Sequence, residues 1–144
     1  MPVFRTRGFT LLELIVVVTI LAILAGLVLP NVIGAGDDAR KQRAVADLKS
    51  IATALNLYKL DNFGYPSTQQ GLDALVRKPA GQPEAKNWRK GGYLQGTEVP
   101  KDPWQRIYLY VQPGQHGEFD VYSLGADGKP GGDDYDADLG HWMQ

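Results

Sequence analysis

The chain opens with a long apolar run that predicts a membrane-spanning helix. Residues 9–29 are interrupted by polar side chains only at Thr10, Glu13 and Thr19. About 20 helical residues cover roughly 30 Å, which is the thickness of the hydrocarbon core of a bilayer. We therefore expect residues 9–30 to form a transmembrane and assembly helix.

A different hydrophobic pattern follows, and it predicts that the helix continues in water. Over residues 37–61 the apolar positions recur at helical spacing, with polar residues between them, as in an amphipathic helix: Val45, Leu48, Ile51, Ala52, Leu55 and Tyr58. Pro30 removes one helical hydrogen bond, so we expect a kink around residues 26–36. We expect the helix to end near residues 61–64, with Gly64 as its C-terminal cap.

Shorter elements are predicted after the helix. Ser67 and Gln70 have the spacing of a capping box, which predicts a short helix over about residues 67–77. Residues 107–112 and 118–123 are rich in β-branched and aromatic side chains and flank a turn at residues 113–117, which predicts a β-hairpin over about 107–123. With a third strand nearby, this sheet would pack on the amphipathic helix, together with Trp88 and Trp104. The fold class is therefore α+β.

Composition and charge exclude several classes of protein. The 144 residues include 15 Lys and Arg and 16 Asp and Glu, so the formal net charge is −1. This balance gives no electrostatic reason to expect a nucleic-acid partner. The chain has no cysteine, which excludes a disulfide, a thiolate metal site and a cysteine-linked lipid anchor.

Residues 1–8 and Glu13 point to a specialised membrane anchor. Arg5 and Arg7 precede the apolar run without an acidic residue, so the positive-inside rule keeps the N-terminus in the cytoplasm. The alternative is a plain signal anchor. A lone carboxylate such as Glu13 costs about 2.5–3.5 kcal/mol at the centre of a membrane helix, and such residues usually have a function and a partner.

The acidic C-terminal loop, residues 124–138, is a candidate calcium site. Five carboxylates share this glycine-rich stretch: Asp127, Asp133, Asp134, Asp136 and Asp138. Ca²⁺ binds six to eight oxygen ligands, including backbone carbonyls. The spacing of residues 134–138 does not make an EF-hand, because Leu139 stands where that loop requires glycine. The alternative is a solvated acidic tail.

The stretch from Gly8 through Phe9 to Glu13 resembles the N-terminal signal of type IV pilins and pseudopilins. The resemblance implies that a prepilin peptidase cleaves the leader, residues 1–8, after Gly8 and methylates the new amine of Phe9. In a packed filament Glu13 of one subunit could then meet the Phe9 amine of its neighbour, because a paired buried charge is tolerated where a single one is not.

Further motifs resemble the major (G-type) pseudopilin of type II secretion. They are Tyr58-Lys59-Leu60-Asp61-Asn62, Tyr65-Pro66, Gln70-Gly71-Leu72, Asp102-Pro103-Trp104, residues 113–117 and residues 123–128. The family implies a type IV pilin-like fold, with residues 31–144 as a periplasmic domain. It also implies an inner-membrane anchor contacting lipid before assembly, and a periplasmic filament that drives export of folded proteins. The implied partners are other copies of the chain, minor pseudopilins and an inner-membrane assembly platform.

The same resemblance implies a structural calcium ion in the C-terminal loop. By motif, the Leu124 carbonyl, Asp127 and Asp138 carry over to this chain. Asp133 and Asp136 are further candidate ligands in a stretch where the family varies, and Asp134 is a weaker candidate.

Two alternatives to this function are kept. One is a type IV pilin for adhesion, motility or DNA uptake, although many such pilins have a disulfide that this chain lacks. The other is a membrane-anchored hydrolase using the acidic cluster. His116, His141 and Ser123 show no nucleophile-and-base pattern in the sequence, so we expect both histidines to be surface or structural residues and the chain not to be an enzyme.

Overall fold

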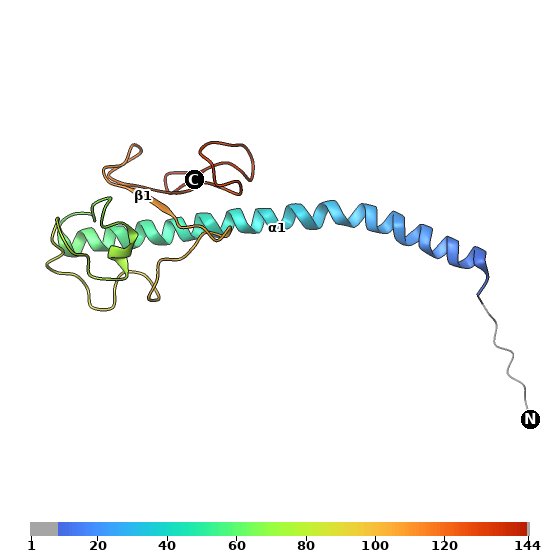
Figure 1. Cartoon of the computed structure of the whole chain (residues 1–144), viewed down its shortest axis with the longest axis horizontal. Coiled ribbons are helices and arrows are strands. Elements are labelled where there is room, and N and C mark those ends of the chain that lie inside the picture. The colour runs from blue at the N-terminus through green and yellow to red at the C-terminus, as the bar shows by residue number, and fades with distance from the viewer. Residues whose placement is uncertain (1–8, 144) are drawn as a thin grey trace, which may run out of the picture. The chain divides into compact units, whose positions relative to one another are not determined.

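A computed structural model describes residues 9–143, with side chains at all of them except residues 26–35. Its elements are the helix α1 (Leu11–Asn62), the 3₁₀ helix η1 (Leu72–Leu75) and the strands β1 (Leu109–Val111), β2 (Asp120–Ser123) and β3 (Leu139–Gly140). Figure 1 shows the long ribbon of α1 and the small amount of strand structure. The predicted α+β class is confirmed. The chain divides into two compact units, one ending at Asp37 and one beginning at Asp38.

The first unit contains the start of α1. The backbone N–H of Glu13 donates to the Thr10 side-chain oxygen (3.2 Å), and the N–H of Leu14 donates to the Thr10 carbonyl (3.2 Å). Thr10 therefore caps the helix by satisfying a donor of its first turn. The apolar side chains of residues 11–24 are exposed around the helix.

Residues 26–36 remain helical, because α1 is assigned without a break from Leu11 to Asn62. Pro30 therefore does not end the helix, and the kink expected there stays a prediction. In the part of the chain with described side chains, no helix is both long enough and apolar enough to cross a membrane.

The second half of α1 supplies one wall of the core. Leu48, Ile51, Leu55 and Tyr58 are buried, as the helical spacing predicted. The interpretation of Val45 was wrong in detail, because Val45 is half-buried and the neighbouring Ala44 is the fully buried residue. Each fully buried leucine contributes about 1.5–3 kcal/mol of hydrophobic free energy.

The end of α1 differs from the prediction. The helix ends at Asn62, within the expected range, but Phe63 (φ 63°) adopts the left-handed conformation and Gly64 does not. The N–H of Phe63 donates to the carbonyl of Lys59 (2.8 Å), so the last turn is closed one residue before the glycine. The prediction of Gly64 as the cap was therefore wrong.

The short helix predicted over about residues 67–77 is also shorter than expected. The capping box does form, since the Ser67 N–H donates to the Gln70 side chain (3.0 Å) and the Gln70 N–H donates to the Ser67 hydroxyl (3.3 Å). Gly71 then adopts φ 60° and ψ −167°, which is not helical. The turn begun at Ser67 cannot propagate through this residue, so only η1 follows.

The three strands form an antiparallel sheet in the order β1-β2-β3. Tyr110 pairs with Val121 in the predicted hairpin, and Ser123 pairs with Leu139 of the third strand. The hairpin and the third strand are therefore confirmed, with shorter strands than expected. In Figure 1 the sheet lies beside the C-terminal part of α1.

The core lies between this sheet, η1 and the second half of α1. Tyr65 and Phe119 meet edge to face with ring centroids 4.8 Å apart. Trp88 and Trp104 are partly buried against this core, which confirms their predicted packing role. The Trp88 indole N–H donates to the carbonyl of Ala74 (2.8 Å). This bond ties the largely irregular stretch between η1 and the sheet, residues 79–106, to η1.

Candidate functional sites

The first candidate site is the N-terminal turn of α1. Phe9 is 84% exposed, and Glu13 is exposed in the first helical turn. A negative charge there is favourable, because the N-terminus of a helix carries partial positive charge. Gly8, the predicted cleavage position, lies outside the described residues. The sequence analysis did not name Thr10 as the helix cap, although the spacing from Thr10 to Glu13 is that of a capping box.

The second candidate site is the C-terminal loop, residues 124–138, which backbone hydrogen bonds fold back on itself. The Gly128 N–H donates to the Leu124 carbonyl (3.1 Å), and the Ala126 N–H donates to the Tyr135 carbonyl (2.8 Å). Gly125 (φ 61°) permits the closest approach, since a Cβ there would lie 2.6 Å from the carbonyl oxygens of residues 136 and 137. The two arms of the loop are therefore in contact at Gly125.

The predicted calcium ligands are placed differently from one another. Asp127 is exposed and its Oδ1 accepts from the Lys129 N–H (2.9 Å). Asp133 and Asp136 are exposed and joined through their backbones, with the Asp136 N–H donating to the Asp133 carbonyl (3.0 Å). Asp134 is exposed and adopts the left-handed conformation (φ 52°).

The carboxylate of Asp138 has one unsatisfied oxygen, which is relevant to cation binding. Its Oδ2 accepts from the Gly131 N–H (2.9 Å), whereas its Oδ1 is buried and has no hydrogen-bond partner. A buried carboxylate oxygen without a partner is costly, and a hard cation would satisfy it. Among the described residues, no three acidic or histidine side chains come together as a metal cluster. The loop supplies oxygen atoms of the kind that Ca²⁺ takes as ligands, and Asp138 is the candidate ligand with a buried side-chain oxygen that has no partner.

Arg106, which the sequence did not single out, contacts this loop from its inner side. The guanidinium of Arg106 donates to the carbonyls of Gly125 and Ala126. Arg106 in turn lies near Asp102, with Nε 3.8 Å from Oδ2. The sequence analysis used residues 102–104 only as a motif of the family resemblance, and nothing in it predicted the contact between Arg106 and Ala126, 20 residues later.

The two histidines belong to a cluster around Asp120 and the C-terminus. His116 Nδ1 lies 3.0 Å from Asp120 Oδ2, and the His116 ring stacks on Trp142 with centroids 3.8 Å apart. His141 stacks on Phe119, and its Nδ1 accepts from the Val121 N–H (3.2 Å). Burial lowers the pKa of His141. Both histidines have the structural role that was expected.

Asp120 is the anchor of that cluster. It is 5% exposed and accepts from the backbone N–H groups of Gln115 (2.8 Å) and His116 (3.2 Å). Burial of the carboxyl opposes ionisation, but the hydrogen bonds from Gln115 and His116 outweigh it and hold the pKa of Asp120 below its usual value.

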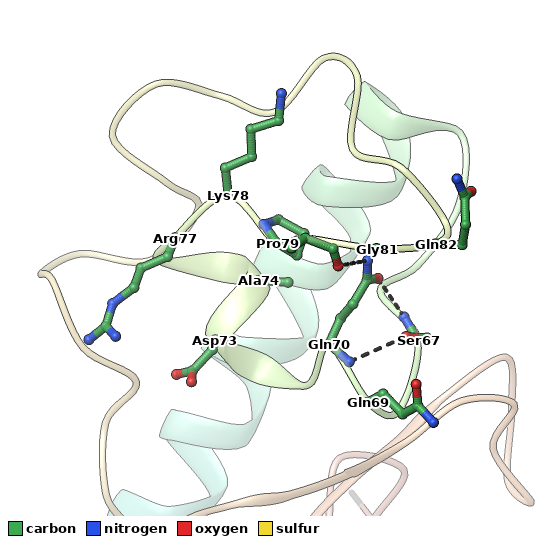
Figure 2. Close-up of a pocket in the computed structure, with 11 residues that line it drawn as sticks. Ser67, Gln69, Gln70, Asp73, Ala74, Arg77, Lys78, Pro79, Gly81 and Gln82 are labelled. Carbon is green, nitrogen blue, oxygen red and sulfur yellow. Dashed lines mark hydrogen bonds between the residues drawn. The ribbon is translucent and has the colours of Figure 1, made fainter.

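A cavity of about 340 Å³ next to η1 does not form a comparable site. Figure 2 shows that the side chains of Arg77 and Lys78 point away from it, while Gln70 lies across its wall. The Gln70 amide donates to the carbonyls of Ala80 (3.1 Å) and Pro83 (3.0 Å). This arrangement braces the loop and presents no converging charges to a ligand.

Comparison with known proteins identifies the family. The family model described as type II secretion system (T2SS), protein G matches residues 31–142, and the prokaryotic N-terminal methylation motif matches residues 4–29. Type II secretion system core protein G of Pseudomonas aeruginosa is 60% identical over 138 residues, covering 96% of each chain. The protein of the same name from Vibrio cholerae is 53% identical, covering 96% of this chain and 92% of that one.

A solved structure supports the same assignment. The major pseudopilin from the type 2 secretion system of enterohaemorrhagic Escherichia coli matches with a TM-score of 0.67 and 42% identity, covering 78% of this chain and 95% of that chain. These similarities favour the pseudopilin interpretation over the type IV pilin alternative. The chain therefore belongs to the protein G family of the type II secretion system.

Proposed function

We propose that this chain is the major structural subunit of the type II secretion pseudopilus, a periplasmic filament that drives export of folded proteins across the outer membrane. The observation that carries the proposal is the 60% identity to a core protein G over 96% of both chains. The exposed apolar side chains of residues 11–24 agree with it, because a surface of this kind requires lipid or other copies of the helix. A structural role of this kind involves no enzymatic activity.

The methylation motif at residues 4–29 supports a proposal for processing and localisation. We expect prepilin peptidase to cleave after Gly8 and to methylate Phe9, which leaves residues 9–30 as a single-pass anchor in the inner membrane. The C-terminal domain then lies in the periplasm, where it would meet minor pseudopilins and the assembly platform. Intact mass and N-terminal sequencing of the membrane form test this proposal. A chain that still begins at Met1 would contradict it.

Assembly would pair Glu13 of one subunit with the Phe9 amine of the next. Phe9 and Glu13 both lie exposed at the start of α1, so the amine that cleavage would create and the Glu13 carboxylate would be accessible to a neighbouring helix. We expect Glu13→Ala to leave insertion and cleavage intact and to abolish filaments seen by electron microscopy. Thr19→Ala is a matched control, because Thr19 is polar and bonds only its own helix, donating to the Ile15 carbonyl (2.7 Å). Normal filaments from the Glu13 variant would defeat this assembly mechanism.

A structural calcium ion in the C-terminal loop is the second part of the proposal. Its ligands would include the Leu124 carbonyl, Asp127 and Asp138, with Asp133 and Asp136 completing the oxygen set. The support from geometry is the buried, unpartnered Oδ1 of Asp138. The bound ion would supply only positive charge, neutralising the loop carboxylates and holding its two arms together.

Chelation tests the calcium proposal directly. We expect EDTA, or Asp127→Ala, to lower the melting temperature of the protein and to stop filament formation. Asp134→Asn serves as the control, because Asp134 is the weakest candidate and asparagine tolerates its left-handed backbone. A melting temperature that is unchanged by EDTA would count against a structural ion.

A further inference from the structure

Asp102 is a buried carboxylate that belongs to neither proposed site. It is 1% exposed and accepts three hydrogen bonds: from the backbone N–H of Trp104 (3.0 Å), the backbone N–H of Arg106 (2.8 Å) and the Ser123 hydroxyl (2.7 Å). Ser123 lies in β2, so these bonds fix the 102–106 turn to the sheet. Asp102 is therefore a fixed carboxylate that is hydrogen-bonded to Ser123, the residue directly before the C-terminal loop.

Arg106 extends from this turn into the loop. Its Nε lies 3.8 Å from Asp102 Oδ2 and is buried without a hydrogen-bond partner. Its Nη1 donates to the Ala126 carbonyl (3.3 Å) and its Nη2 donates to the Gly125 carbonyl. The planar guanidinium therefore bonds two successive loop carbonyls through two different nitrogens, in a fixed geometry that a flexible ammonium group does not provide.

The loop backbone is shaped around this side chain. Gly128 has φ 70°, and a Cβ at that position would lie 2.8 Å from Arg106 Nη1. The absence of a side chain at Gly128 leaves room for the guanidinium beneath the first turn of the loop. That turn closes over Arg106 through the hydrogen bond from the Gly128 N–H to the Leu124 carbonyl (3.1 Å).

We propose that Arg106 is a positioning residue, held by Asp102, that pre-orders the C-terminal loop from its inner side and thereby raises the affinity of the loop for a divalent cation. The part concerning affinity rests on the proposed calcium site, whereas the part concerning loop order does not. Without Arg106, cation binding would have to order the 124–128 turn. The apparent dissociation constant would then rise in inverse proportion to the population of loop that remains ordered.

Electrostatic repulsion between Arg106 and the cation would change the affinity in the opposite direction. A guanidinium near a cation site also repels the cation, and this effect alone would make binding tighter when Arg106 is removed. Asp102 offsets part of that repulsion, since its carboxylate lies beside the guanidinium. We therefore expect pre-ordering to dominate, and the direction of the change in affinity distinguishes the two effects.

The first experiment measures hydrogen exchange of the full-length protein in detergent with EDTA present. In Arg106→Gln, peptides covering residues 124–138 should exchange about tenfold faster than in the wild type, because charge-assisted bonds to two carbonyls are lost. Peptides from residues 44–58 of α1 should be unchanged. Arg106→Lys should retain part of the protection of the loop. Arg89→Gln is the control: it removes a half-exposed ion pair with Asp61 (3.2 Å) and should leave the exchange rate of the loop at the wild-type value.

The outcomes decide the proposal. Equal loop exchange in Arg106→Gln and the wild type would overturn it, and so would a uniform increase that includes α1, because that would show a general loss of stability. The second experiment titrates Ca²⁺ by calorimetry, and we expect the dissociation constant of Arg106→Gln to rise about five- to tenfold. Tighter binding would overturn the affinity claim. If the wild type binds no Ca²⁺, the calcium proposal fails while the exchange result still decides the role of Arg106.

Discussion

Replacement of Asp120 by asparagine should destabilise the domain that begins at Asp38. The carboxylate accepts from two backbone N–H groups and contacts the His116 ring, all within 3.2 Å. Asparagine keeps one oxygen acceptor and turns an NH₂ group toward donors that the second oxygen had satisfied. Because hydrogen bonds to a buried charged group contribute about 1.5–3 kcal/mol each, losing one of them should cost about 2–3 kcal/mol. For a domain of about 100 residues this lowers the melting temperature by about 8–12 °C.

The acid dependence of stability gives a second signature of Asp120. Its folded-state pKa lies below the value of about 3.9 expected in the unfolded chain. The stabilisation is therefore complete above about pH 4 and is lost as the pH falls through the folded-state pKa, because the unfolded chain binds the proton more readily. In Asp120→Asn the stability should be lower at neutral pH, and its decline below pH 4 should be shallower.

Thermal unfolding followed by circular dichroism between pH 7 and pH 2 measures both effects. Glu118→Gln is the control, because Glu118 is 66% exposed and solvent screens its ion pair with Lys59 (2.6 Å), so its loss should change the melting temperature little. A fall in melting temperature of less than about 2 °C for Asp120→Asn would refute the reasoning, because it would correspond to well under 1 kcal/mol. If stability declines below pH 4 as steeply in Asp120→Asn as in the wild type, the lowered pKa of Asp120 is refuted.

Three further substitutions test other parts of the fold. Leu48→Ala removes a fully buried core side chain and should cost about 3–5 kcal/mol in chemical denaturation. Gly114→Ala should cost about 2 kcal/mol or more, because its Cβ would lie 2.4 Å from the backbone carbon of Phe119, and a stability equal to wild type would contradict this contact. The wild type should lose stability as the pH falls from about 6.5, because partial burial lowers the pKa of His141 and the unfolded chain takes up the proton more readily, and His141→Asn should abolish this loss. Denaturant midpoints at pH 7 and pH 5 measure this last effect.

The parts of the fold that the sequence predicted are those with strong periodicity. The spacing from Leu48 to Tyr58 located the buried face of α1, and the turn at residues 113–117 located the hairpin. Errors occurred where a single backbone conformation decides the outcome. At the end of α1 the left-handed residue is Phe63, and at residues 67–77 the non-helical Gly71 limits the helix. Neither conformation follows from the side-chain pattern, because the backbone conformation of a single residue leaves no periodic signal in the sequence.

The sequence predicted where the candidate sites lie along the chain, but it predicted little of their geometry. Asp138 was named from the motif, and the structure shows that one of its oxygens is buried without a partner. Arg106 and Asp102 were not named as site residues, because their contacts reach residues 123–126 across the fold. Long-range contacts of this kind leave no periodic signal in the sequence. Thr10 could have been found, since its spacing to Glu13 is a local pattern.

The order of the elements along the chain constrains how this domain is made. The helix α1 comes first, while the hydroxyl of Tyr108 that bonds Asp47 (3.0 Å) and the strand that contains Leu139 come late. Sheet strands of two to four residues cannot form a stable unit by themselves. During synthesis the part of the apolar face of α1 that the sheet covers therefore stays exposed until Leu139 has been added, so the nascent domain depends on protection from aggregation until then.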